Sequence, residues 1–215
     1  MNLLPRELLL KTSQVDHADW NYHPILGAIS KCRFRAALHM LTGRRFGRLL
    51  EIGYGSGIFL PQLANCAGEL YGVDVHHKAG EVAERLRRTR THAQLFTSDV
   101  QSLPFPKRYF DCVVAISACE FILDLESACR EIHRVLSDRG IFIVITPRNS
   151  AALDAGLKLL TGESAAHDFG TRRNRLIPTL LKHFWPLETR SIGLPFLPFY
   201  TALKLCRRAS LPLAA

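Results

Sequence analysis

The sequence of 215 residues predicts one α/β domain: a seven-stranded, mostly parallel sheet with helices on both faces and a C-terminal antiparallel hairpin. Two observations predict it. From about residue 48, short apolar runs rich in β-branched and aromatic residues alternate with segments of helical periodicity, which is typical of parallel strands joined by crossover helices. After the fifth run, two more strand-like segments follow each other across a loop that contains Gly and Pro, as in a hairpin.

The strands are short runs whose composition fits burial on both faces of a sheet. The five core strands are expected at residues 48–52, 70–75, 94–97, 111–116 and 140–146. The two strands of the hairpin are expected at residues 187–192 and 199–206, joined by a loop at 193–198.

Apolar residues spaced three and four apart predict the helices. They are expected at residues 34–41, 79–86, 125–136, 153–160 and 177–184, with one more that starts near residue 58. Asp124 is placed to cap the helix at 125–136, and a turn at 138–140 ends that helix. Pro178 suits the first turn of the last helix.

The charge is uneven along the chain. There are 28 Lys and Arg against 19 Asp and Glu, a net charge of +9. Residues 1–50 and 151–215 carry +5 each, whereas residues 51–150 carry −1. Basic ends favour an anionic partner such as nucleic acid or a lipid surface, but solvated surface charge explains them equally simply. No basic run with interleaved aromatic residues supports nucleic-acid binding.

The cysteines and the apolar segments indicate the cellular location of the protein. None of the six cysteines forms a CxxC pair or a zinc-ligand spacing, so we expect reduced thiols and no metal. The N-terminus lacks a secretory pattern, and the longest late apolar run, residues 191–203, is too short to span a bilayer. We therefore expect a cytoplasmic protein without a transmembrane segment.

The most informative segment is residues 49–57, LLEIGYGSG, in which an apolar strand runs into three glycines. Glycines there let the backbone approach a ligand closely. The spacing is G-x-G-x-G and not the G-x-G-x-x-G of dinucleotide sites. Asp74 ends the next strand, where a carboxylate can accept both hydroxyls of a ribose, and Asp99 follows the third strand at the same sheet edge. We expect the neighbouring His76 and His77 at the surface.

In order and spacing, these features resemble the class I S-adenosylmethionine-dependent methyltransferases of the type 11 kind, over roughly residues 48–148. The stretches that carry the resemblance are residues 50–57 (LEIGYGSG), 71–74 (YGVD), 98–100 (SDV), 103–106 (LPFP), 110–114 (FDCVV), 131–136 (EIHRVL) and 140–144 (GIFIV). The resemblance implies a Rossmann-like sheet with S-adenosylmethionine as cofactor and S-adenosylhomocysteine as product.

The resemblance also implies roles for particular residues. Asp74 would bind the ribose hydroxyls, Val75 and Asp99 would contact the adenine, and Ser117 would lie near the sulfonium. The full set of implied cofactor-binding residues is Glu51, Gly53, Tyr54, Gly55, Gly57, Asp74, Val75, Asp99, Val100 and Ser117. Two positions depart from the family: Tyr54 stands where small residues are frequent, and Phe121 where many relatives carry histidine.

Acceptor specificity is expected outside the core at 48–148, in an N-terminal helical lid at 1–47 and in residues 149–215, which form a second lid and complete the sheet. Polar and aromatic density predicts acceptor contacts at Trp20, Tyr22, His167 and Arg172, the last two in a loop at 161–175. His23 and Glu120 are the candidate bases. Ordinary packing, capping and ion pairs are the alternative for each of these residues.

The function predicted from these features is methyl transfer to a small-molecule or lipid-like acceptor by in-line displacement. A nucleic-acid methyltransferase that uses the basic flanks and a non-catalytic cofactor-binding scaffold remain as alternatives. The apolar segment 194–200 and the basic residues after it leave peripheral membrane contact open, with burial in the sheet as the other explanation. The oligomeric state is not predicted.

Overall fold

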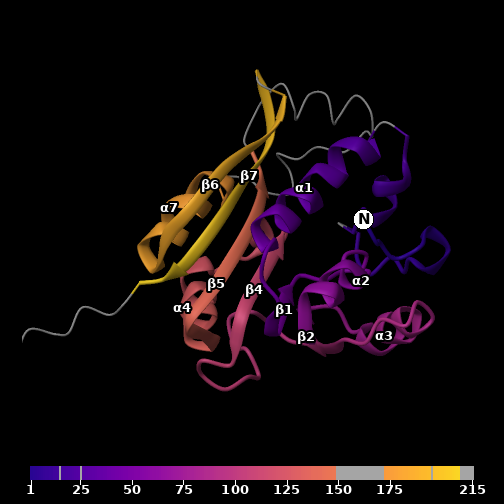
Figure 1. Cartoon of the computed structure of the whole chain (residues 1–215), viewed down its shortest axis with the longest axis horizontal. Coiled ribbons are helices and arrows are strands. Elements are labelled where there is room, and N and C mark those ends of the chain that lie inside the picture. The colour runs from indigo at the N-terminus through magenta and orange to yellow at the C-terminus, as the bar shows by residue number, and fades with distance from the viewer. Residues whose placement is uncertain (15, 25, 149–171, 195, 209–215) are drawn as a thin grey trace, which may run out of the picture.

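A computed structural model describes residues 1–14, 16–24, 26–148, 172–194 and 196–208. Its centre is a seven-stranded sheet in the order β3-β2-β1-β4-β5-β7-β6 (Figure 1). The strands β1 to β5 pair in parallel, and β7 pairs antiparallel with β5 and β6. The predicted fold class is therefore confirmed. The strands are β1 Phe46–Ile52, β2 Ala67–Asp74, β3 Gln94–Thr97, β4 Phe110–Ile116, β5 Leu136–Pro147, β6 Phe184–Leu194 and β7 Leu197–Arg207.

Helices cover both faces of the sheet. They are α1 Leu26–Leu41, α2 Leu60–Leu63, α3 Ala79–Arg87, α4 Leu125–Val135 and α7 Arg172–His183, with single 3-10 turns at η1 Arg6–Leu8, η2 Ala18–Tyr22, η3 Ala64–Cys66 and η4 Cys119–Phe121. One hydrophobic cluster joins α1, α2 and α3 to the first face, and a second joins α4 and α7 to the other. Neighbouring residues of one strand divide between them: Leu49 belongs to the first cluster and Leu50 to the second.

Three local predictions were wrong. The segment 138–140 is not a turn, because β5 already begins at Leu136, which is fully buried and pairs with Phe110 of β4. The helix after the glycines is α2, a single turn that begins at Leu60. Pro178 lies inside α7, not in its first turn, because the helix begins at Arg172. The predicted helix at 153–160 lies outside the described residues.

The start of α7 also replaces part of the expected loop at 161–175 by a helix. The buried side chains of Leu176 and Leu180, four residues apart, anchor α7 in the second cluster, and this packing outweighs the missing N–H of Pro178. Phe184, expected at the end of this helix, is the first residue of β6.

Three further predictions concern the cysteines, metal ligands and membrane-spanning helices. All six cysteines are free thiols. In the part of the chain that the structure describes, no three His, Cys, Asp or Glu side chains cluster as metal ligands. The helices of the same residues include none with the length and apolar character that crossing a bilayer requires.

Candidate active site

The glycine loop leaves β1 in a conformation that other residues rarely adopt. Gly53 has φ +71° and Gly55 has φ +52°, both in the left-handed region. A Cβ on Gly53 would lie 2.5 Å from the Cβ of Ala118, which follows β4. The loop therefore passes against the end of β4 at a distance that only glycine permits at this position. Backbone N–H of Gly53 donates to the carbonyl of Val73, which ties the loop to β2 as well.

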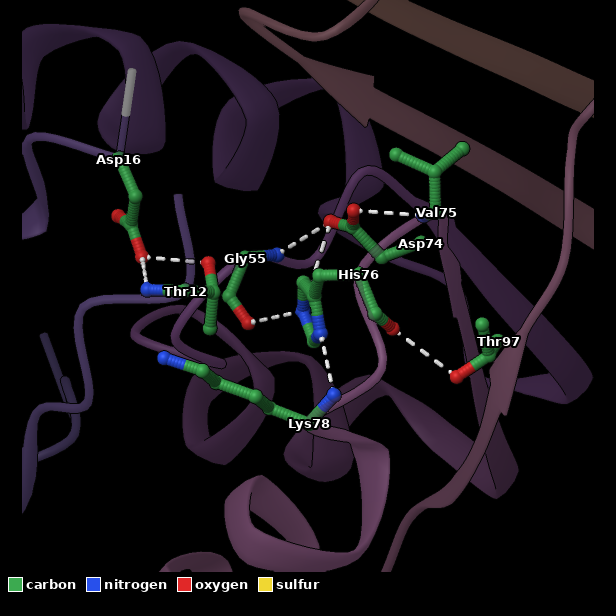
Figure 2. Close-up of polar contacts among 8 residues, drawn as sticks. All are labelled: Thr12, Asp16, Gly55, Asp74, Val75, His76, Lys78 and Thr97. Atoms are coloured by element: carbon green, nitrogen blue, oxygen red, sulfur yellow. Dashed lines mark hydrogen bonds and ion pairs between the residues drawn. The ribbon is translucent and has the colours of Figure 1, made fainter. Parts of the chain in front are cut away.

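The loop is fastened to the end of β2 by side chains (Figure 2). One oxygen of Asp74, Oδ2, accepts from the backbone N–H of Gly55 at 2.8 Å, and Oδ1 accepts from that of Val75 at 2.8 Å. His76 reaches back to the same loop: its Nε2 lies 3.0 Å from the carbonyl oxygen of Gly55. Asp74 and His76 thus hold the N–H and the carbonyl of one glycine.

The tautomer of His76 follows from its contacts. The backbone N–H of Lys78 donates to Nδ1 at 3.1 Å, so Nδ1 is the acceptor and Nε2 carries the proton that is donated to Gly55. The side chain of His76 is 7% exposed and packs edge-on against Tyr54. The prediction that His76 lies at the surface was wrong, because these bonds draw the ring under the loop; His77 is exposed as expected.

A cavity of about 890 Å³ opens at this edge of the sheet. Nine of the ten residues predicted to bind cofactor line it: Glu51, Gly53, Tyr54, Gly55, Asp74, Val75, Asp99, Val100 and Ser117. The tenth, Gly57, packs against α3, and a Cβ there would lie 3.0 Å from the side chain of Val82. Val75 and Asp99 are exposed, whereas Val100 is buried. Ser117 has φ +52°, which marks a sharp change of chain direction at the end of β4.

Two buried carboxyl groups line the same cavity. Glu51 is 4% exposed and Glu120 1% exposed, and the Oε2 atom of each has no hydrogen-bond partner among the described residues. Burial raises the pKa of Glu51 to about 8, helped by the charge of Asp74 and opposed by Arg33. Burial raises the pKa of Glu120 to about 7, against the lowering effect of its backbone and of Arg173 and Arg33. Such groups near neutrality can exchange protons with a bound molecule.

A comparison with known families identifies the kind of domain that carries this cavity. Residues 50–144, from β1 to β5, match the family described as a methyltransferase domain. Residues 50–144 belong to this family of methyltransferase domains, and the chain is similar over this region to proteins named as methyltransferases. The match covers the glycine loop, Asp74, Asp99 and Glu120, all of which line the cavity.

Curated relatives are similar to this methyltransferase over its core. It is 30% identical over 128 residues to a phosphatidylethanolamine N-methyltransferase of Cereibacter sphaeroides, covering 58% of this chain and 60% of the relative. It is 29% identical over 124 residues to a ubiquinone/menaquinone biosynthesis C-methyltransferase of Nitrosospira multiformis, covering 55% of this chain and 50% of the relative. The chain thus spans half to three fifths of the length of these two relatives.

The fold is shared with solved structures. The N-methyltransferase NodS of Bradyrhizobium japonicum, in complex with S-adenosylhomocysteine, superposes with a TM-score of 0.66 at 18% identity, covering 93% of this chain and 95% of that one. At this identity the likeness shows the fold, which here extends beyond the matched family core.

The predicted acceptor residues of the methyltransferase are not all at the cavity. Trp20 lines it. Tyr22 is not among the described lining residues, and its hydroxyl donates to the carbonyl of Leu4. His23 likewise lies off the lining, where its Nδ1 accepts from the backbone N–H of Leu26 at the start of α1. Arg172 is the first residue of α7, and His167 lies outside the described residues.

Several lining residues of the methyltransferase were not predicted from the sequence. The main ones are Asp16, Arg33, Arg148, Arg173 and Tyr200. Arg33 had a usable signal: it falls on the same face of α1 as Leu26, Ile29 and Ser30, which also line the cavity. Tyr200 had none, because β7 reaches the cavity only by pairing with β5.

Proposed function

We propose that this protein transfers a methyl group from S-adenosylmethionine to a small-molecule or lipid-like acceptor. The observation that supports the proposal is one cavity that joins the glycine loop, held by Asp74 and His76, to two buried carboxyl groups without full hydrogen bonding. The first feature suits a nucleoside ligand, and the second suits the removal of a proton from an acceptor.

The residues present fit the cofactor. A carboxylate has about four lone-pair sites. The backbone uses one on each oxygen of Asp74, which leaves two for the hydroxyls of a ribose. The exposed Val75 offers an apolar surface to an adenine ring, and the orphaned Oε2 of Glu51 offers an acceptor to a cationic group. Gly55 leaves room beside the loop, since the nearest atoms to a Cβ there would be those of the Asp16 carboxylate at 3.7 Å.

The protein has to align the acceptor with the methyl group and remove a proton from the acceptor. The cofactor supplies a methyl group on a sulfonium, which is already activated for displacement. The chain holds the acceptor in line and excludes water, an effect worth up to about 7–11 kcal/mol in well-aligned systems. Glu120 takes the proton of a hydroxyl or amine acceptor on its free Oε2. His23 is the weaker candidate because its Nδ1 already accepts from Leu26.

The lining favours an acceptor with an apolar part. Side chains on the acceptor side include Leu26, Ile29, Phe34, Phe121, Ile122 and Phe199, together with the cations Arg33, Arg148 and Arg173. Apolar walls with a few cations suit a lipid-like molecule that carries an anionic group. The relatives named above are, by their names, an N-methyltransferase of phosphatidylethanolamine and a C-methyltransferase of ubiquinone/menaquinone biosynthesis, which agrees with this class.

Calorimetry with S-adenosylhomocysteine tests the cofactor site. Replacing Asp74 by Ala should lower the affinity at least tenfold, because hydrogen bonds to a charged group are worth about 1.5–3 kcal/mol each. Asp111→Ala is the control, since Asp111 accepts from the backbone N–H of Arg48 at the opposite end of β1, far from the cavity. A wild-type chain that binds neither cofactor nor product would overturn the proposal.

The acceptor class needs a second experiment. The chain is incubated with methyl-labelled S-adenosylmethionine and either the organic-soluble or the water-soluble fraction of a cell extract. Label in an organic-soluble product supports a lipid-like acceptor, label in a water-soluble product a small polar one. Cofactor binding without any labelled product favours the non-catalytic scaffold.

A further inference from the structure

The cavity separates its charged side chains along the sheet. Asp74 ends β2 and Asp99 follows β3, both on one side of β1. Arginines lie on the other side. Arg33 belongs to α1, which packs against β4, β5, β7 and β6 (Figure 1), and Arg148 follows β5. The end that we propose for the cofactor therefore carries acids, which suit a sulfonium, and the end that we propose for the acceptor carries cations.

Arg33 differs from Arg148 in its contacts. Arg148 is exposed, and its Nη1 donates to Oγ of Ser191 at 3.2 Å. Arg33 is half-buried, and its Nε has no hydrogen-bond partner among the described residues. The guanidinium lies over the ring of the neighbouring Phe34, 4.9 Å from the ring centroid. The described chain thus leaves part of the hydrogen-bonding capacity of Arg33 unused.

Two buried carboxyl groups lie near Arg33 without neutralising it fully. Burial raises the pKa of Glu51 to about 8 and that of Glu120 to about 7, and the charge of Arg33 opposes both shifts. At neutral pH, Glu51 is therefore mostly protonated and Glu120 partly protonated. A cation in such a site is costly when its counter-charge is incomplete. A ligand with an anionic group would supply the missing charge.

The surroundings of Arg33 indicate the shape of that ligand. A guanidinium presents parallel N–H donors that match the oxygens of a carboxylate or a phosphate. Leu26 and Ile29 lie on the same face of α1 as Arg33, and both line the cavity. Phe34 lines it as well. A molecule with an apolar body and one anionic group fits this face of the helix.

Two ligands of the proposed reaction can bring an anionic group: the cofactor, which ends in an amino-acid carboxylate, and the acceptor. The position of Arg33 favours the acceptor. Its charge acts on Glu120, which follows β4, and it opposes the effect of burial on the pKa of Tyr200 in β7. Both residues lie on the opposite side of β1 from Asp74.

We propose that Arg33 is a specificity-determining residue that binds the carboxylate or phosphate of an acceptor with an apolar body. The acceptor is then held close to Glu120, the proposed proton acceptor. This inference rests on the proposed function, because it assigns one of the two ligands of that reaction to Arg33.

Titration calorimetry with simple amphiphiles tests this role. The whole chain, saturated with S-adenosylhomocysteine, is titrated with decanoate, decyl phosphate and the uncharged decanol, each below its critical micelle concentration. We expect at least one anionic probe to bind at least tenfold more tightly than decanol, because decanol lacks the charge-assisted hydrogen bonds. Arg33→Gln should remove this preference. Arg33→Lys should keep part of it, since lysine retains the charge but not the fork of donors.

The matched control is Arg35→Gln. Arg35 lies on the same helix, two residues further along, and is exposed. The substitution removes the same charge, so the variant should prefer the anionic probe as the wild type does. Circular dichroism and binding of S-adenosylhomocysteine verify that each variant folds.

Three results would overturn the inference: no preference of the wild type for either anionic probe, an equal loss of preference in Arg33→Gln and Arg35→Gln, or an affinity for S-adenosylhomocysteine that falls in Arg33→Gln as much as that for the anionic probe. The last result would assign Arg33 to the carboxylate of the cofactor.

Failure of the proposed function gives a different result. A wild-type chain that binds no S-adenosylhomocysteine removes both proposals. Binding of S-adenosylhomocysteine without a preference for an anionic probe removes the role of Arg33 alone.

Discussion

The two ends of the cavity are built differently. At the end that we propose for the cofactor, backbone groups are held in place by hydrogen bonds within residues 53–78, so the shape is set before a ligand arrives. At the end that we propose for the acceptor, Arg33, Glu120 and Tyr200 meet from α1, η4 and β7, and Glu120 keeps an oxygen without a partner among the described residues. The first end is ordered by its own bonds, whereas the second has hydrogen-bonding capacity that an acceptor can satisfy.

The largest effect is expected at the cofactor end. Gly53→Ala places a Cβ 2.5 Å from that of Ala118 at a residue with φ +71°, so clash and backbone strain add. We expect the free energy of unfolding to fall by on the order of 4 kcal/mol, measured by chemical denaturation. The control is Gly43→Ala, where φ is +80° but no atom lies within 4 Å, and the loss should be about 1 kcal/mol. Equal losses would show that the close approach to β4 does not matter.

The burial of Glu51 predicts a pH effect on the ligand-free protein. The folded carboxyl has a pKa raised by burial to about 8, against 4.5 for the free group, so the folded state binds the proton more tightly. The contribution of Glu51 to the free energy of unfolding is therefore complete below about pH 4.5 and is lost as the pH rises through 8, by on the order of 3 kcal/mol. Glu51→Gln should remove this contribution and leave the smaller decline that the raised pKa of Glu120 produces up to about pH 7, and Glu84→Gln, at an exposed residue of α3, should keep both. Denaturation from pH 5 to 8 measures both.

At the acceptor end, Glu120→Gln should lower turnover about a hundredfold while the affinity for S-adenosylhomocysteine stays unchanged. In the wild type, turnover should rise with pH through about 7, because the raised pKa of Glu120 means that the base form appears there. The variant should lose this step. If the variant keeps the rise of turnover with pH near 7, the rise belongs to another group and Glu120 is not the proton acceptor.

The smallest effect concerns the bonds under the glycine loop. His76→Phe keeps a ring against Tyr54 but loses the donor to Gly55 and the acceptor for Lys78. Calorimetry should show an affinity for S-adenosylhomocysteine about tenfold lower, since two hydrogen bonds contribute about 0.5–1.5 kcal/mol each. His77→Phe, at the exposed neighbour, should bind as the wild type does. Identical affinities for the two variants would contradict the role of His76 in holding the loop.

Local patterns explain why much of the fold was predictable. All seven strands were expected near their observed places, because a buried parallel strand has a recognisable composition over a few residues. The errors lie at boundaries. Leu136 continues into a strand because pairing with Phe110 is available, and α7 includes Pro178 because Leu176 and Leu180 are buried against the sheet. Both decisions depend on partners far away in the sequence.

The cofactor end of the site was predictable for the same reason, and the acceptor end was not. Motifs at 50–57, 71–74 and 98–100 are short, and seven of the residues chosen from them line one cavity together with Val75 and Ser117. Polar density near residues 16–24 also indicated a site, but the orientation of each side chain there depends on packing. Trp20 faces the cavity, whereas Tyr22 bonds to Leu4 and His23 to the start of α1.

The amino-acid sequence by itself determined the succession of strands and helices and the conformation of the glycine loop, because hydrophobic periodicity and backbone sterics act over a few residues. Only the tertiary structure decided that Arg33, Glu120 and Tyr200 share a cavity. The physical reason is that strand pairing brings together segments more than fifty residues apart, and burial there alters the chemistry of a carboxyl group that no local pattern distinguishes from a surface one.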